Sequence, residues 1–501
     1  MPLPGPARAD EELELKYTID DPGAAEGWFD EHYPDREGWR TVRMVDRYFD
    51  TAGRALFDAG YGARLRQVGR KTVLTLKSDI DVTDGRHQRL ELEGHATQEL
   101  DVNAWKPSAA RDRVAEVVGE RRLIELFLVR QKRRERPISV DGAELMVSID
   151  LGKVVAAGRE VGPIVQLEVE HLRGRRVPLD EVARQIREAG IGRPESRSKL
   201  AMAHELAEAA SVVAADDKLA EAGRKVLRRH LVRLLSREPG ARDGDELETK
   251  QMRVATRRLR ATWGVFADAF KARVARERQH ALRDIGRAIG EVRDLDVLIA
   301  TVENKPALTP LTDSWRAQRA AAHDDLVRLL DSKRYRRFVD EMLEFTASPG
   351  KGARRKRGSR PVAEAISTAL QTAVESLHVT ESLTPQTADV DAAWHARRIE
   401  ARRLRYSVEA FLDVLDETPS RKLLDSITRL QDRLGALQDG TVAMEKVGGW
   451  LDEQDGALPE ELQSAVDAYL DRRLRDVEKS RIGLDAAWSA LMTQAEALTK
   501  R

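Results

Sequence analysis

The sequence predicts an α+β protein of several domains, with an antiparallel β region and peripheral helices first and an all-helical, duplicated region second. Three observations predict this. Segments between residue 11 and about residue 205 alternate apolar and polar residues, as strands with one buried face do. Beyond about residue 205 the apolar residues recur at helical spacing, and two motifs there repeat at one common offset. A chain of 501 residues is also too long for a single core.

Short strands account for most of the N-terminal region. Turn-forming pairs separate them, among them Asp84-Gly85, Asp141-Gly142 and Gly162-Pro163. The alternating segments are EELELKYTI (11–19), ARLRQV (63–68), TVLTLKS (72–78), HQRLELEG (87–94), LFLVRQKRR (126–134), ELMVSIDLG (144–152) and IVQLEVEHL (164–172). Helices are predicted around this β region at 23–33, 111–120 and 179–189.

The helical region contains two similar halves. KQMRVATRRLR (250–260) aligns without gaps to HARRIEARRLR (395–405), and GEVRDLDV (290–297) aligns to GALQDGTV (435–442), both at an offset of 145. We therefore predict a disordered N-terminus (1–10), a β domain (11–205), a linker (206–215) and a helical domain (216–498). The halves of the helical domain, 216–346 and 361–498, are joined by the Gly- and Arg-rich segment 348–361, which is expected to be flexible.

Composition excludes several kinds of function. Lys plus Arg and Asp plus Glu both number 85, so a globally basic nucleic-acid binder is not indicated and any polyanion site must be local. The chain has no cysteine, which excludes disulfides, thiolate catalysis and cysteine-based zinc sites. No apolar run approaches a membrane span, and the N-terminus lacks the apolar core of a signal peptide, so a cytoplasmic location is expected.

Charged side chains share one face of each predicted strand. In the first strand Glu12, Glu14 and Lys16 lie on one side, and Leu13 and Leu15 lie on the other. The same parity groups Arg64, Arg66, Lys77, Glu91, Glu93, Arg130, Lys132, Arg134, Asp150, Glu168 and Glu170. A solvated sheet face explains one such strand. For seven strands whose apolar faces pack against helices, the charged faces are instead expected to meet inside a closed or nearly closed barrel.

Such an interior must hold water, ions and a ligand, because an unpaired buried charge costs several kcal/mol, about 3–5. Carboxylates are hard oxygen ligands that suit Mg²⁺ or Mn²⁺, and Arg and Lys suit phosphate oxygens. A lining with both sets fits a metal–polyphosphate ligand.

The motif ELELK at 12–16 resembles the ExExK motif that opens the CYTH superfamily, the triphosphate tunnel metalloenzymes. The segments RLR, TLK, RLELE, VRQKRR, SIDLG, LEVE and SRSKLAMA follow in that family's order, over residues 11 to about 205. The resemblance implies an eight-stranded antiparallel tunnel that acts on triphosphate compounds with a divalent metal. Carried over by position, the metal ligands would be Glu12, Glu14, Asp150, Glu168 and Glu170, and the phosphate-binding residues Lys16, Arg64, Arg66, Lys77, Arg130 and Lys199.

Some roles within this resemblance stay open. In RQKRR the family's spacing favours Arg130 as the residue that enters the tunnel, with Lys132 and Arg134 of the same parity. Glu91 and Glu93 also match, in roles that the sequence does not separate. A second metal, or a carboxylate such as Glu168 or Glu170, would orient the attacking water, and the sequence offers no candidate for a covalent nucleophile.

Two basic arcs occupy equivalent positions in the helical halves. On a helix of about 100° per residue, the first arc contains Lys250, Arg253, Arg257 and Arg260, and the second contains His395, Arg398, Arg402 and Arg405. Apolar arcs stand apart from them, with Met252, Leu259, Trp263 and Phe266 in one half and Leu404, Val408 and Phe411 in the other. One basic arc is commonly a solvated face, whereas two equivalent arcs favour a shared anion groove.

These helical segments resemble the CHAD domain, a bundle named for its conserved histidines, over about residues 216–498. The resemblance implies binding of inorganic polyphosphate. Lys250 stands where that family usually has histidine, which keeps a positive charge but argues against a metal-ligand or acid–base role there. His395 fits the family, as an anion ligand or as a structural hydrogen-bonding residue.

The sequence therefore predicts metal-dependent hydrolysis of triphosphate compounds, inorganic triphosphate or short polyphosphate, with polyphosphate bound by the helical domain. That domain would deliver substrate or direct the protein to polyphosphate granules. The alternatives are an adenylyl cyclase of the same superfamily and a non-enzymatic polyphosphate-binding adaptor with an inactive tunnel. No membrane or nucleic-acid partner is expected, and the oligomeric state is not predicted.

Overall fold

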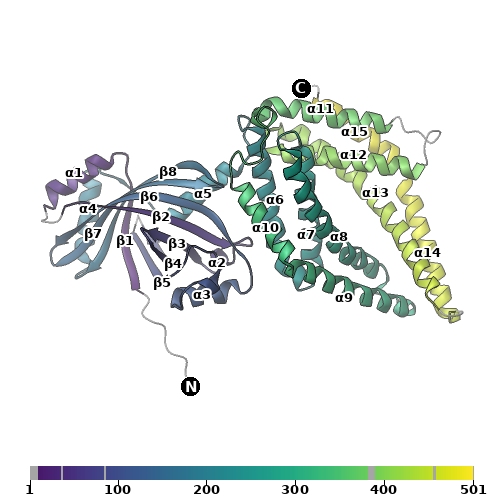
Figure 1. Ribbon diagram of the computed structural model, residues 1–501, viewed down its shortest axis with the longest axis horizontal. Helices are drawn as coiled ribbons and strands as arrows, with labels where there is room; N and C mark the ends of the chain where they lie inside the picture. Colours follow the sequence, from purple (N-terminus) through teal and green to yellow (C-terminus); the bar gives the residue numbers. More distant parts are fainter. Residues whose placement is uncertain (1–9, 35–37, 84–85, 382–389, 455–457, 500–501) are drawn as a thin grey trace, which may run out of the picture. The chain divides into compact units, whose positions relative to one another are not determined.

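The computed structural model describes residues 10–34, 38–83, 86–381, 390–454 and 458–499 (Figure 1), without the side chains of 10–12, 79–83, 88–89 and 390–391. Of the predicted disordered N-terminus (1–10), residues 1–9 lie outside this part of the chain, and Asp10 belongs to a strand. The chain divides into two compact units, Met1–Ser211 and Val212–Arg501, and each is described by itself. No helix in the described ranges combines the length and the apolar character that crossing a membrane requires.

The first unit is built around a closed antiparallel barrel. Its sheet runs in the order β5-β4-β3-β2-β6-β7-β8-β1, and β1 pairs with β5 to complete the ring. The two-residue strand β9 (Arg193–Pro194) pairs with the end of β1. The long strands are β1 (Asp10–Thr18), β2 (Arg40–Thr51), β3 (Tyr61–Val68), β4 (Lys71–Thr83), β5 (Arg86–His95), β6 (Leu123–Val140), β7 (Ala143–Ala156) and β8 (Arg159–Arg173). The predicted antiparallel β fold is confirmed.

Helices cover the outer faces of these strands, as predicted. Leu13 and Leu15 of β1 pack with α1 (Pro22–His32) and α4 (Val177–Glu188). On another side, apolar residues of β3 and β4 pack with α2 (Ala55–Asp58) and α3 (Ala109–Val118). Because the apolar faces are buried outside the ring, the alternate residues of most of these strands point into it.

Helix α5 (Lys199–Ser211) packs against an apolar part of the barrel lining. There Tyr48, Phe127 and Val129 form a buried cluster with Ala203 of α5. Gly62 of β3 allows a close approach, because a Cβ at this position would lie 2.5 Å from Leu200 Cδ2. The predicted linker 206–215 therefore needs a correction, since residues up to Ser211 belong to this helix.

The second unit is all helical, as predicted. Shifted by 145 residues, α7 and α8 fall on α12 and α13 to within five residues at every end, which is consistent with a duplication. The helices are α6 (Leu219–Arg242), α7 (Glu246–Val265), α8 (Ala272–Val302), α9 (Thr309–Asp331), α10 (Lys333–Thr346), α11 (Val362–Glu381), α12 (Val390–Ala410), α13 (Glu417–Asp452), α14 (Glu460–Arg481) and α15 (Leu484–Thr499).

The segment 348–361 differs from the flexible connection that the sequence predicts. The backbone N–H of Arg354 donates to Ala269 O at 2.9 Å, and that of Lys271 donates to Gly352 O at 3.0 Å. Gly358 packs so closely that a Cβ there would lie 2.6 Å from Ala269 O. These backbone bonds hold the segment against the end of α7, despite its Gly- and Arg-rich composition.

Candidate functional site

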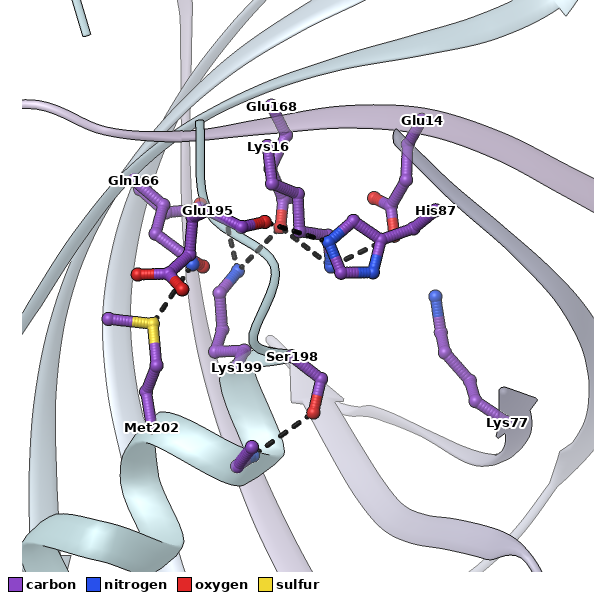
Figure 2. Close-up of polar contacts among 12 residues, drawn as sticks. Glu14, Lys16, Lys77, His87, Gln166, Glu168, Glu195, Ser198, Lys199 and Met202 are labelled. Carbon is purple, nitrogen blue, oxygen red and sulfur yellow. Dashed lines mark hydrogen bonds and ion pairs between the residues drawn. The ribbon is translucent and has the colours of Figure 1, made fainter. Parts of the chain in front are cut away.

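The barrel interior holds a cluster of buried ion pairs from five elements. Lys16 of β1 places Nζ 2.8 Å from Glu14 Oε1 and 3.5 Å from Glu168 Oε1 of β8. Lys199, the first residue of α5, places Nζ 2.6 Å from Asp150 Oδ2 of β7 and 3.3 Å from Glu168 Oε1. Figure 2 shows Lys16, Glu168 and Lys199 together, with Lys77 of β4 on the opposite side.

Arg133 of β6 completes this cluster. Its Nε and Nη2 donate to the two oxygens of Asp150 at 2.8 and 2.6 Å, and Nη2 also donates to Glu168 Oε2 at 2.7 Å. Asp150 therefore accepts a bidentate guanidinium bond and an ammonium bond while its own exposure is 0%. Such charge-assisted bonds are what allows carboxylates to stay ionised away from water.

The pKa values of the cluster reflect this compensation. Burial would raise the pKa of Asp150, but the charges of Lys199 and Arg133 outweigh it and lower that pKa. Burial would also raise the pKa of Glu168. This pKa is nevertheless held well below the usual range by the positive charges of Lys199, Lys16, Arg133 and Lys77. Both carboxylates are therefore ionised at neutral pH.

A second group of charges centres on Asp46 of β2. Arg66 Nε and Nη2 each donate to this carboxylate at 2.8 Å, Arg64 lies at 3.4 Å, and Gln131 Nε2 donates at 2.7 Å. Burial would raise the pKa of Asp46, but Arg64 and Arg66 lower it. The two arginines, both predicted phosphate ligands, are thereby fixed with their guanidinium groups inside the ring.

The remaining predicted site residues of the first unit lie on strands β1, β4, β5 and β8. Lys77 Nζ lies 3.1 Å from Glu91 Oε2, which joins β4 to β5, and Glu93 accepts a bond from the buried Thr75 hydroxyl at 3.2 Å. Glu170 lies opposite Glu14 in the β1–β8 register and is half-buried. Glu12 lies in β1, but its side chain is outside the described part.

In the second unit the two predicted basic arcs face each other across α7 and α12. Burial lowers the pKa of Arg402, Tyr406 opposes this shift, and the charges of Arg257, Arg398 and Arg260 add to it. Burial likewise lowers the pKa of Arg398, where Asp439 opposes the shift and Arg257 and Arg253 add to it. The apolar arcs of both helices are buried, as predicted.

The other members of the arcs are more exposed or are paired. Lys250, Arg257, Arg260 and His395 are exposed. Arg405 donates to Glu409 and Gln431 at 2.9 and 2.8 Å, and Arg253 donates to Asp294 at 2.6 Å. The least compensated positive charge therefore lies between Arg257 of α7 and Arg398 and Arg402 of α12.

Family comparisons match both units. The CYTH domain profile covers residues 10–203, and the CHAD domain profile covers residues 225–448. The chain is a CYTH–CHAD protein. CYTH domains are metal-dependent triphosphate tunnel enzymes, triphosphatases or cyclase-like proteins, and CHAD domains are associated with polyphosphate.

Three solved structures illustrate the similarity. The CHAD domain from the plant Ricinus communis is 24% identical, over 56% of this chain and 93% of that one, with a TM-score of 0.47. PptA from Streptomyces chartreusis is 16% identical, over 54% and 99%, with a TM-score of 0.41. The putative adenylyl cyclase HpAC1 from Hippeastrum, described as having a dominant triphosphatase activity, is 21% identical, over 39% and 95%, with a TM-score of 0.31.

In this CYTH domain the predicted orientation of strand β6 is wrong by one residue. Arg130 and Lys132 are exposed on the outside of the barrel, and Arg134 pairs there with Glu26 of α1 at 2.9 Å. Arg133 and Gln131 point inward instead. The reason is that Phe127 and Val129 of the same face pack with α5, so the inner face of β6 begins apolar and becomes charged further along.

Sequence reasoning also missed other interior residues. Asp46 follows Met44 on a face that appears apolar from the sequence, and β2 as a whole was not among the predicted strands. His87 is fully buried, and its Nε2 lies 2.9 Å from Glu195 O. A signal was available for the strand itself, because TVRMVDRYF (41–49) is rich in β-branched and aromatic residues.

Glu195 anchors the segment that leads into α5. Its carboxylate accepts bonds from Arg197 Nε and Nη2 at 2.9 and 2.8 Å and from Thr18 Oγ1 at 3.0 Å. The Arg197 bonds, working against burial, lower the pKa of Glu195 to about 2.

Glu195→Gln is expected to destabilise the CYTH domain at pH 7 but not at pH 2. The folded pKa lies below the unfolded value of about 4.3, so the stabilisation is complete above about pH 4.3 and is lost as pH falls toward 2. Urea unfolding of both proteins at several pH values, followed by circular dichroism, measures the difference. Glu205→Gln removes an exposed partner of the same arginine and serves as the control. A difference that persists unchanged at pH 2 would contradict this assignment.

The carboxylates suit a divalent metal by their chemistry. Their oxygens are hard donors, and the buried Glu14 Oε1 accepts no hydrogen bond from the described residues, although Lys16 Nζ is 2.8 Å away. Among the described side chains, no three carboxylates or histidines lie close enough together to hold a metal ion. A complete metal site would therefore include a residue such as Glu12 or oxygens of the substrate.

Proposed function

We propose that the CYTH domain hydrolyses inorganic triphosphate or short polyphosphate with Mg²⁺ or Mn²⁺, and that the CHAD domain binds polyphosphate. The observation that carries the proposal is the buried cluster of Asp150, Glu168, Lys16, Arg133 and Lys199. Keeping several charges in a barrel interior costs free energy that an apolar lining would avoid. A ligand that carries both signs of charge, such as a metal ion with a phosphate chain, would bind to both the carboxylates and the basic residues of this lining.

Substrate binding would exchange one set of ion pairs for another. In the described cluster the bases are neutralised by carboxylates, at distances between 2.6 and 3.5 Å. A phosphate chain would draw Lys16, Arg64, Arg66 and Arg133 toward its oxygens, and Glu12, Glu14 and Glu170 would then hold the metal. The basic residues would then balance the phosphate charge, and the metal would balance the carboxylates. Each buried charge would therefore keep a partner of opposite sign.

The hydrolytic step needs a positioned water and no covalent intermediate. Glu168 is held ionised by its four basic neighbours, so it can accept a hydrogen bond from water and orient the attack. Lys199, whose Nζ lies 3.3 Å from Glu168 Oε1, would keep that carboxylate in place. The metal would supply neutralisation of charge on the phosphate oxygens.

Polyphosphate binding by the CHAD domain is supported by the facing arcs of α7 and α12. Arg398 and Arg402 are partly desolvated, and the positive charge of Arg257 acts on both of them. A polyanion between the arcs would relieve that repulsion. Lys250 and His395 lie at the exposed ends of the arcs and would extend the contact.

Glu14→Gln is expected to lower turnover of inorganic triphosphate by about 100-fold or more, because it removes a buried charge while it keeps the shape of the side chain. The matched control is Glu26→Gln on the outside of the barrel, which should keep full turnover. Phosphate, pyrophosphate and cyclic nucleotide are measured from inorganic triphosphate, polyphosphate and nucleoside triphosphates, with Mg²⁺ and with Mn²⁺. Cyclic AMP as the main product of the unmodified protein would contradict the proposal and support the cyclase alternative. The absence of any turnover would contradict it and support the adaptor alternative.

A further inference from the structure

The outer face of the barrel carries a groove that the proposed hydrolysis does not use. It has a volume of ≈ 720 Å³ and is formed by β2, β6, β7 and β8 and by the turn after β3. Its apolar lining comes from Val45, Leu151, Pro163 and Val165. These residues alternate with the inward-facing Asp46, Asp150 and Gln166, so the groove lies on the opposite side of the sheet from the tunnel.

Four basic residues also line this groove. In the strand register Arg43 lies directly opposite Lys132, and Arg130 lies directly opposite Lys153. Arg130 and Lys132 are two residues apart on one face of β6. Since neighbouring strands lie about 4.8 Å apart and alternate residues of a strand about 6.7 Å apart, the four form a staggered row of positive charge that runs from β2 across β6 to β7. Like charges directly opposite each other destabilise a sheet.

Basic residues elsewhere on this outer face are neutralised. Arg47 of β2 pairs with Glu125 at 2.7 Å, and Arg134 of β6 pairs with Glu26 at 2.9 Å. Within the described residues, Arg43, Arg130 and Lys132 have no carboxylate within 4.0 Å, and no acid lines the groove. Lys153 alone of the four is paired, with Glu160 at 3.0 Å. On the outer face of β2 and β6, the described basic residues without a carboxylate partner therefore lie in the groove.

From this charge and this lining we infer a second ligand site, which takes an organic phosphate of nucleotide size. Its phosphate groups would lie along the row formed by Arg43, Lys132, Arg130 and Lys153. Its apolar body would cover Val45, Leu151 and Val165, and the groove volume is in the range of small-ligand sites. An inorganic phosphate chain has no group for this apolar surface, so the site should prefer a nucleoside triphosphate over inorganic triphosphate.

The absence of cysteine from the sequence permits a test that reports on this groove alone. Gln67→Cys places one thiol on the groove wall, outside the four basic residues. The rate of its alkylation is measured in the full chain with adenylyl-imidodiphosphate, a nucleotide that resists hydrolysis, or with inorganic triphosphate. Val177→Cys, at a position that is 63% exposed and outside the groove lining, is the control.

The nucleotide should slow alkylation of the Gln67→Cys thiol at least fivefold, also when saturating inorganic triphosphate is present, and should leave the Val177→Cys thiol unaffected. Adding Arg130→Gln and Lys132→Gln to the Gln67→Cys chain should abolish the protection, without changing thermal unfolding or triphosphate hydrolysis. No protection, equal protection by inorganic triphosphate alone, or protection that survives the two glutamine replacements would overturn the inference. Hydrolysis is measured separately, so failure of the tunnel proposal would be recognised independently.

Discussion

Arg133→Met is expected to lower the free energy of unfolding of the CYTH domain by about 3–5 kcal/mol and to abolish triphosphate turnover. The guanidinium group contacts Asp150 at 2.6 Å and Glu168 at 2.7 Å, and both carboxylates are almost completely buried. Methionine would leave these two negative charges with the ammonium groups of Lys16, Lys199 and Lys77 and without a guanidinium group. The cost is therefore that of uncompensated buried charge, and not only that of lost hydrogen bonds.

Arg134→Met is the matched control for this prediction. Arg134 is the next residue on the same strand, but it points outward to Glu26, and both side chains of that pair are 26% exposed. A partly exposed ion pair is worth about 0–1 kcal/mol, so stability and turnover should change little. Hydrogen–deuterium exchange of β6 and β7 peptides measures both variants within the CYTH domain. Equal losses in the two variants would show that the inward face of β6 is assigned wrongly.

Arg402→Gln is expected to weaken polyphosphate binding by about 10- to 100-fold, since a hydrogen bond to a charged group is worth about 1.5–3 kcal/mol. The same replacement is expected to raise the stability of the CHAD domain. Burial and the neighbouring charges of Arg257, Arg398 and Arg260 lower the pKa of Arg402, which means that the folded state disfavours its charge. Opposite changes in affinity and stability are the signature of a binding residue kept at a structural cost.

Arg403→Gln serves as the control in the same helix. Arg403 is the residue after Arg402 in α12. Its side chain is 69% exposed and pairs with Glu400. Its replacement should change neither binding nor stability appreciably. Polyphosphate titration at two salt concentrations, together with thermal unfolding, measures both variants, and the salt dependence should decrease only for Arg402→Gln. A loss of stability in Arg402→Gln would contradict the repulsion argument.

Alternation along the strands predicts most of the barrel interior correctly. Glu14, Lys16, Asp150 and Glu168 all point inward, because in β1, β7 and β8 the apolar residues on the other face pack under α1 and α4. In β6 basic residues occupy both faces, so alternation alone cannot choose between Arg133 and its neighbours. The choice depends on α5, whose packing makes the first inward residues of β6 apolar, and this contact is remote in the sequence.

The helical unit has the same division between local and remote information. Spacing within α7 and α12 separates the basic from the apolar arcs, and the repeat predicts that the two helices are equivalent. The fixed conformation of 348–361 could not be predicted, because the backbone partners Ala269 and Lys271 lie about 80 residues earlier. The composition of a segment indicates its flexibility in isolation, but it does not predict backbone hydrogen bonds to distant residues.

The position of β1 has a consequence for the order in which this protein can acquire its structure. Among the barrel strands β1 is synthesised before the others, yet it pairs with β5 and with β8, whose nearest paired residues lie about 70 and 150 positions later in the chain. Lys199, which neutralises Asp150, is made later still. Glu14 and Lys16 therefore lack their neighbours in β8 until almost the whole first unit has been synthesised. Folding dominated by such distant pairings is slow, and a nascent chain shorter than about 200 residues cannot close the barrel.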